Sequence, residues 1–293
     1  MKPPPFKYHA CRTIDEAVGI LDSDPDGSKV LAGGQSLVPV LNLRLAAPDN
    51  LVDINSIESL DHIRVQPDHV AIGAGTRQYV VERSDQLHSV LPVVREALSH
   101  VGHSQIRNRG TVVGSICHAD PAAEMPAVFL TVGGEVTAHS AAGTRTIGSD
   151  DFFESYLTTA LEPNEIVTQV KFDIPSGRTG WYFEEVARRH GDFAILGVVA
   201  LVSLEGDTVS RARITIFGGG ATPLRMTAAE QLITGAKASD IGGDLLERAA
   251  IEASAAVRPT DDIHASADYR RHVAGLLTRR AVTRSLERAG SPA

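Results

Sequence analysis

The 293-residue chain is long enough for two domains, and its 43% of apolar residues can build cores of ordinary size. A formal net charge of −8, with basic residues scattered along the chain, disfavours nucleic acid or an anionic membrane as a partner. The longest near-continuous apolar run, Ala194 to Leu204, is far shorter than the roughly 20 residues of a membrane-spanning helix. Because the first residues also lack the apolar core of a signal peptide, we expect a cytoplasmic protein without membrane insertion.

The first informative segment runs from Lys29 to Ile54 and reads KVLAGGQSLVPVLNLRLAAPDNLVDI. Its pattern predicts an apolar strand, a Gly-Gly turn, a short helical stretch and a second strand. Backbone N–H groups in such a turn can approach an anionic ligand without a side chain in the way. Taken alone, the motif is more often an ordinary turn, so its meaning depends on the rest of the chain. The motif comprises Ala32, Gly33, Gly34, Gln35 and Ser36.

A second glycine-bearing stretch follows about eighty residues later, within Ser104 to Val128, which reads SQIRNRGTVVGSICHADPAAEMPAV. Its central hexapeptide, Gly110-Thr111-Val112-Val113-Gly114-Ser115, predicts another tight loop, and two such loops could bind one diphosphate. Arg107 and Arg109 flank this loop. Their planar guanidinium groups would either meet phosphate oxygens or pair with surface acids, and the sequence leaves both interpretations open.

Three other polar patterns are weak candidates for chemistry. The hexapeptide from Gly73 to Gln78 begins like a dinucleotide fingerprint but ends in glutamine where a small residue belongs. His100 and His103 could share a helix face as metal ligands, yet no third ligand is spaced with them, so we interpret them as a helix end. Cys117-His118 would point to opposite faces of a strand, which disfavours a nucleophile and base pair.

The cysteine content limits the redox groups that this chain can carry. Cys11 and Cys117 are the only two cysteines, whereas a [2Fe–2S] cluster normally takes about four thiolate ligands. The chain therefore does not carry its own iron–sulfur relay, and no metal site is predicted. A disulfide between two thiols this far apart in sequence is not expected in a reducing compartment.

A change of pattern near Pro175 predicts a division of the chain. Strands and helices alternate before it, in two lobes of about 1–55 and 56–176. Beyond it, three apolar stretches predict an antiparallel sheet at 181–186, 194–204 and 209–217.

The remainder of the chain has helical patterns at 228–234, 245–257 and 269–288. In the last of these, Val273, Leu276 and Leu277 form the predicted buried stripe among arginines. A glycine-rich turn at 218–220 precedes these helices.

Two more motifs complete a set of four in order along the chain, namely GDFA at 191–194 and SADYRRHVAGLLTRRAV at 266–282. With the two glycine stretches, they make nearly the whole chain resemble one family. It resembles the FAD-carrying medium subunit of molybdenum hydroxylases, the group that includes xanthine dehydrogenase and aerobic carbon monoxide dehydrogenase.

Four positions depart from the pattern of that family. Gln35 stands where histidine is common, and Val113 replaces a usual glycine, which tightens the second loop. Glu124 replaces a more frequent aspartate, and its longer carboxylate would reach a ribose or ribityl hydroxyl. Phe193 replaces a tyrosine of some relatives, which retains stacking but removes a phenol hydrogen bond.

The resemblance implies an α+β protein with FAD between two lobes. Residues 1–176 would form a two-lobed FAD-binding fold of the p-cresol methylhydroxylase type. Residues 177–293 would form a smaller α+β domain of the carbon monoxide dehydrogenase flavoprotein type, an antiparallel sheet plus helices in which the 218–220 turn is structural. The implied FAD contacts are Ala32, Gly33, Gly34, Gln35, Ser36, Leu37, Gly110, Thr111, Gly114, Ser115, Glu124, Val167, Asp192 and Phe193.

The implied activity is electron transfer, with no catalytic residue assigned in this chain. A large molybdenum-cofactor subunit would oxidise the substrate, and a small subunit with [2Fe–2S] clusters would pass electrons to this chain's FAD. An external acceptor would then receive them, in a complex expected to be a dimer of heterotrimers. Two alternatives stay open: a free-standing FAD-dependent oxidase, and a non-catalytic assembly protein of the same fold.

Overall fold

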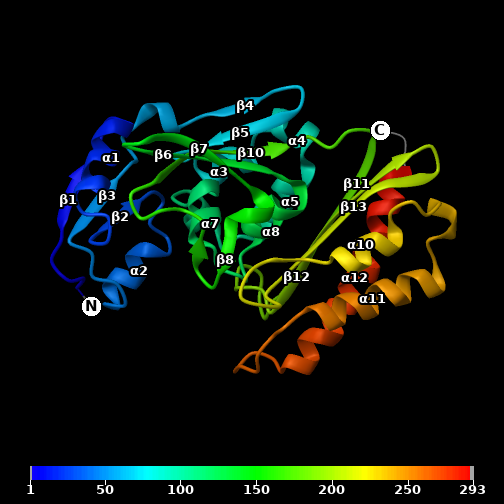
Figure 1. Ribbon diagram of the computed structural model, residues 1–293. Helices are drawn as coiled ribbons and strands as arrows, with labels where there is room; N and C mark the ends of the chain where they lie inside the picture. The colour runs from blue at the N-terminus through cyan, green and yellow to red at the C-terminus, as the bar shows by residue number, and fades with distance from the viewer. Residues whose placement is uncertain (1, 291–293) are drawn as a thin grey trace.

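The computed structural model describes residues 2–290, which fold into three sheets and a small hairpin (Figure 1). In Figure 1 the sheets follow one another from the blue N-terminal end to the yellow and red C-terminal end, with helices between and outside them. Within residues 2–290, no helix combines the length and apolar character needed to cross a bilayer.

The first sheet consists of three parallel strands in the order β1-β3-β2. These strands are β1 (Lys7–Ala10), β2 (Ser28–Leu31) and β3 (Asn50–Asp53). Two helices connect them, α1 (Ile14–Ser23) and α2 (Leu37–Asn42). A capping box at Thr13 and Glu16 starts α1. The strand, turn, helix and strand predicted between residues 29 and 54 are therefore confirmed.

The second sheet is antiparallel, with the order β4-β5-β10-β6-β7. Its strands are β4 (Ile63–Val65), β5 (His69–Gly73), β6 (Gly134–Ser140), β7 (Gly143–Gly148) and β10 (Ile166–Asp173). The long insertion between β5 and β6 supplies α3 (Gln78–Glu82), α4 (Asp85–Val90), α5 (Pro92–His100), α6 (Ser104–Arg107), α7 (Val112–His118) and α8 (Glu124–Val132). The shorter elements are the 3₁₀ helix η1 (Glu58–Leu60), α9 (Ser149–Phe152), β8 (Phe153–Ser155) and β9 (Thr158–Thr159).

The helix α8 is the centre of the largest apolar core. All nine of its residues are buried, and Phe129 makes edge-on ring contacts with Phe152, Phe153 and Phe172. Because α8 packs between the second sheet and the last one, this core fixes both relative to the insertion.

The last sheet is antiparallel in chain order, β11-β12-β13-β14. Its strands are β11 (Arg178–Val186), β12 (Leu196–Glu205), β13 (Thr208–Phe217) and β14 (Leu224–Arg225), which confirms the three predicted stretches. On β12, Val199 and Leu201 join the core around α8, while Val198 and Ala200 join a second core. Both faces of this strand are thus buried, which explains its continuous apolar sequence.

Helices cover the outer face of the last sheet and close the second core (Figure 1). They are α10 (Thr227–Ile233), the 3₁₀ helix η2 (Ala238–Asp240), α11 (Gly243–Ala256) and α12 (Ala267–Gly290), as the sequence predicted for the three α-helices. Val273 and Leu277 are buried, but Leu276 is 43% exposed, so its place in the buried stripe was wrong. At 100° per residue, Leu276 lies on the opposite side of α12 from the buried Ala274 and Ala281.

Candidate functional site

Both glycine motifs border one cavity of about 570 Å³. The cavity lies where β2, the insertion helices, β10 and the β11–β12 turn meet. All fourteen residues that the family resemblance implied as cofactor contacts line it: Ala32, Gly33, Gly34, Gln35, Ser36, Leu37, Gly110, Thr111, Gly114, Ser115, Glu124, Val167, Asp192 and Phe193. The fold therefore brings together segments that are far apart in sequence, since Ala32 and Phe193 are separated by 161 positions.

The first motif presents unpaired backbone donors at this cavity. Gly34 has φ +74°, a conformation that glycine adopts without strain, and Gln35 Nε2 donates to the Gly33 carbonyl at 3.2 Å. Within residues 2–290, the backbone N–H groups of positions 33 to 36 have no hydrogen-bond acceptor. Four free donors on one turn are suited to an anionic ligand.

The second motif is a helix start, where the sequence had predicted a loop through Ser115. Thr111 is the N-cap of α7, and its Oγ1 accepts a hydrogen bond from the Gly114 N–H at 3.0 Å. Val112 and Val113 are buried in the core, so the valine that replaces a family glycine packs as part of a helix face. Capping and apolar burial together account for the helix.

The Thr111 cap gives the first testable expectation. Thr111→Ala should lower the free energy of unfolding by about 1 kcal/mol, because the Gly114 N–H loses its acceptor. Urea denaturation of the flavin-free chain measures this change. Thr111→Ser keeps the hydroxyl group, so its free energy of unfolding should remain near that of the wild type. Equal losses in both variants would mean that the methyl group, rather than the cap, supplies the stability.

Glu124, the first residue of α8, places a buried carboxyl group on the cavity wall. It is 7% exposed, and burial is the main reason why its pKa rises to about 8; the nearby carboxylate of Glu185 acts in the same direction. His100 Nδ1 lies 3.3 Å from Glu185 Oε1, and this hydrogen bond raises the pKa of His100. The Glu124 carboxyl group on the cavity wall therefore holds its proton more tightly than an exposed glutamate does.

The GDFA turn between β11 and β12 lies at the rim of the cavity. Gly191 has φ +86° and packs so closely that an added Cβ would lie 2.9 Å from the Gly102 carbonyl oxygen. The turn thereby contacts the end of α5, which is the part of the chain where His100 and His103 were predicted to form a helix end. Asp192 is exposed and Phe193 is 71% exposed. The aromatic ring therefore stands at the cavity mouth, accessible to solvent.

The secondary structure expected at Cys117 and His118 was wrong. Cys117 and His118 lie in α7, not in a strand, and burial raises the pKa of the Cys117 thiol to about 12, so it does not act as a nucleophile. No group of three metal-ligating side chains occurs in the part of the chain that the structure describes.

Gln78 was noted in the sequence only as a misfit to a dinucleotide fingerprint. In the structure it begins α3 on the cavity wall, and its buried Oε1 has no hydrogen-bond donor among residues 2–290. A glutamine in place of a small residue was the available signal, but its unpaired oxygen depends on the tertiary packing.

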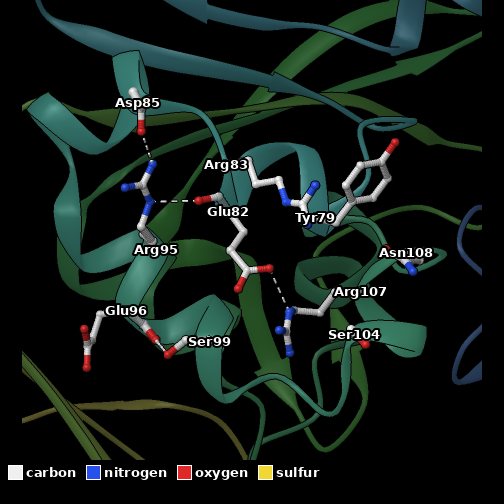
Figure 2. A pocket seen from close by; sticks show the side chains of 10 residues that line it. All are labelled: Tyr79, Glu82, Arg83, Asp85, Arg95, Glu96, Ser99, Ser104, Arg107 and Asn108. Atoms are coloured by element: carbon white, nitrogen blue, oxygen red, sulfur yellow. Dashed lines mark hydrogen bonds and ion pairs between the residues drawn. The ribbon is translucent and has the colours of Figure 1, made fainter.

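A second, more open groove of about 640 Å³ lies among α3, α4, α5 and α6 (Figure 2). Figure 2 shows two ion pairs in this groove, in which Arg95 is bonded to Asp85 at 2.8 Å and Arg107 is bonded to Glu82 at 2.9 Å. Arg107 also donates to the carbonyls of residues 101 and 102, which resolves its role as structural. Neither Arg107 nor Arg109 is among the residues that line the 570 Å³ cavity.

Two families match successive parts of the chain. Residues 4–176 match the family described as the FAD binding domain in molybdopterin dehydrogenase. The chain belongs to this FAD-binding family of molybdopterin dehydrogenases. Residues 181–285 match the CO dehydrogenase flavoprotein C-terminal domain. The family predicted from the four motifs is therefore confirmed, and the chain carries an FAD-binding domain.

Relatives align with this FAD-binding protein over almost their full length. The chain is 40% identical over 291 residues to the 6-hydroxypseudooxynicotine dehydrogenase complex subunit alpha of Paenarthrobacter nicotinovorans, covering 99% of this chain and 97% of the relative. It is 37% identical to the caffeine dehydrogenase subunit beta of Pseudomonas sp. strain CBB1, covering 98% and 97%.

A solved structure supports the predicted α+β fold of this FAD-binding protein. The match is to carbon monoxide dehydrogenase from Hydrogenophaga pseudoflava, in a form that lacks the Mo-pyranopterin moiety of the molybdenum cofactor. The TM-score is 0.94 at 35% identity, covering 98% of this chain and 99% of that chain. The predicted fold class is confirmed.

The groups on the cavity wall fit FAD chemically. The free N–H groups of residues 33–36 match the oxygens of a diphosphate, which accept hydrogen bonds but donate none. The unpaired Gln78 Oε1 and the Glu124 carboxyl group match hydroxyl donors of a ribose or ribityl chain. A volume of about 570 Å³ lies within the roughly 300–1,000 Å³ range of small-molecule sites.

Proposed function

We propose that the chain is the FAD-carrying electron-transfer subunit of a multi-subunit molybdenum hydroxylase. The observation that carries the proposal is the convergence of both glycine motifs, Glu124 and the GDFA turn on one cavity, in a chain that belongs to an FAD-binding family. As an oxidoreductase subunit, it would receive electrons from an iron–sulfur partner and pass them to an external acceptor.

The residues of this chain would bind and orient the cofactor. The turn at residues 33–36 would donate N–H groups to the diphosphate, while Gln78 and Glu124 would accept hydrogen bonds from hydroxyl groups. Phe193 at the mouth would cover the ring system on the side nearest solvent. FAD, when bound, supplies a group that can take up electrons singly and release them as a pair.

The need for partners follows from the cysteine content and from the relatives. Two cysteines are too few for a [2Fe–2S] cluster, so the electrons would arrive from another chain. The names of full-length relatives describe them as subunits of dehydrogenase complexes. A large molybdenum-cofactor subunit and a small iron–sulfur subunit are the proposed partners, and a dimer of heterotrimers is the proposed assembly.

The free-standing oxidase alternative is less well supported. Relatives named as a dehydrogenase complex subunit, a dehydrogenase subunit and a dehydrogenase medium chain match 96% to 99% of this chain, which favours a subunit over a free-standing enzyme. The assembly-protein alternative requires loss of FAD, and the cofactor test below decides it. We retain the domain boundary at residue 176 and the cytoplasmic location as parts of this proposal.

Denaturing the purified protein and analysing the released chromophore by mass and absorbance tests the proposal. One FAD per chain is the expected result, with molybdenum and iron present when the chain is purified together with its partners. FAD without any molybdenum or iron partner would favour the free-standing oxidase. A folded protein that contains no flavin and binds none when FAD is added would overturn the electron-transfer proposal and would favour the non-catalytic assembly protein.

A further inference from the structure

Arg77 links the two glycine motifs without lining the cavity between them. It is the N-cap residue of α3, and its Nη2 donates to Asn55 Oδ1 at 2.6 Å. Its Nη1 donates to the backbone carbonyl of Arg109, the residue before Gly110. One rigid guanidinium fork therefore bridges the first lobe and the second motif.

Asn55 extends the link to the first motif. Its Nδ2 donates to the Ala32 carbonyl at 2.9 Å, immediately before Gly33. Asp53, at the end of β3, orients Asn55 because its Oδ1 accepts from the Asn55 N–H at 2.8 Å. Tyr8 on β1 in turn donates to Asp53 Oδ2 at 2.5 Å. The connection thus begins on the parallel sheet and is anchored by two strands.

The contact that this connection spans is unusually close. A Cβ added to Gly33 would lie 2.6 Å from both the Arg109 carbonyl oxygen and the Gly110 Cα. Arg77 binds the Arg109 carbonyl, which is itself part of this contact, and Asn55 binds the carbonyl of Ala32, the residue before Gly33. Hydrogen bonds to these two carbonyls therefore fix how the motifs face each other.

We propose that Asn55 and Arg77 form a clamp that sets the spacing of the two glycine motifs and so positions them to bind one diphosphate. The inference rests on the proposed function, because it concerns how the same cavity holds FAD. Both are positioning residues, since neither lines the cavity. Arginine suits the task because its two terminal nitrogens donate in fixed directions to acceptors on different segments.

FAD titration of the flavin-free full-length chain tests the clamp. Arg77→Ala should raise the dissociation constant of FAD about 10- to 100-fold, the scale for losing hydrogen bonds from a charged donor. Asn55→Ala should produce a similar increase, and the double variant should bind little worse than either single variant, because both act through one connection. Asn55→Ala alone tests the clamp if Arg77→Ala does not fold.

Two control variants separate positioning from charge and from general stability. Arg95→Ala removes an arginine with a similar set of bonds, to the Glu82 carbonyl and to Asp85, away from the cavity. It should lower the unfolding temperature yet leave FAD affinity within about twofold of the wild type. Arg77→Lys keeps the positive charge but lacks the forked guanidinium group, so this variant should bind FAD as weakly as Arg77→Ala does.

The outcomes distinguish the clamp from the function on which it rests. Wild-type protein that binds no FAD would overturn both. If the wild type binds FAD but Arg77→Ala and Asn55→Ala bind it equally well, the clamp is wrong and the proposed function stands. Restored affinity in Arg77→Lys would also overturn the clamp, because a positive charge alone would then explain the effect. In the Arg77→Ala and Asn55→Ala variants, the dissociation constant of ADP should rise by the same factor as that of FAD. The dissociation constant of riboflavin, which lacks the diphosphate, should not change.

Discussion

Gly33→Val is expected to abolish measurable FAD binding. The new side chain would start 2.6 Å from two backbone atoms, the Arg109 carbonyl oxygen and the Gly110 Cα, so no rotamer can relieve the overlap. The two motifs would have to separate, and the diphosphate would lose donors on one side. FAD titration, followed by the change in flavin fluorescence, measures the loss, and circular dichroism verifies the fold.

Gly19→Ala is the matched control for this glycine substitution. Gly19 lies on the exposed side of α1, and an added Cβ would meet no atom within 4 Å. We expect unchanged FAD binding and a gain of about 0.5–1 kcal/mol in stability, the usual difference between glycine and alanine in a helix. A folded Gly33→Val protein with wild-type FAD affinity would show that the close approach of the motifs is not needed for binding.

Glu124→Gln is expected to remove a large pH dependence of stability. Burial raises the pKa of Glu124 in the folded chain to about 8, well above the pKa of about 4.3 that a glutamate has in an unfolded chain. Between these values the folded chain binds more protons than the unfolded chain, so stability falls as the pH rises. At roughly 1.4 kcal/mol per pH unit, the total loss is on the order of 5 kcal/mol.

The glutamine variant cannot ionise and should therefore be close to the wild type at pH 5 but clearly more stable at pH 8.5. Chemical denaturation of the flavin-free protein between pH 5 and 9 measures both curves. Glu58→Gln, at an exposed position, serves as the control and should retain the wild-type slope. Parallel curves for Glu124→Gln and the wild type would mean that Glu124 is hydrated and ionised in the folded protein.

Local signals explain what the sequence predicted well. Alternating and continuous apolar stretches indicated β11, β12 and β13, and the Gly-Gly turn between two strands indicated the first motif. Each of these features depends on residues within about ten positions of one another, where backbone preferences and side-chain periodicity act. The four motifs likewise indicated the family from short segments, although their number and order were needed for specificity.

The errors arose where packing overrides a local pattern. Val112 and Val113 interrupt a glycine-rich stretch, yet apolar burial and the Thr111 cap turn that stretch into a helix. Leu276 fits an apolar periodicity, but the buried face of α12 is set by the position of the sheet beneath it. Arg107 could have met phosphate or acid, and the placement of Glu82 decided between them.

The sequence by itself determined the family and the order of the elements, because these follow from short motifs and periodicity. The family resemblance also indicated fourteen of the residues that line one cavity, although Gln78 on the same wall was missed. Only the tertiary structure decided the unpaired oxygen of Gln78, the raised pKa of Glu124 and the link from Asn55 through Arg77 to the second motif. Those features depend on burial and on hydrogen bonds between residues more than twenty positions apart. Such contacts form only when the lobes pack together, so no local pattern encodes them.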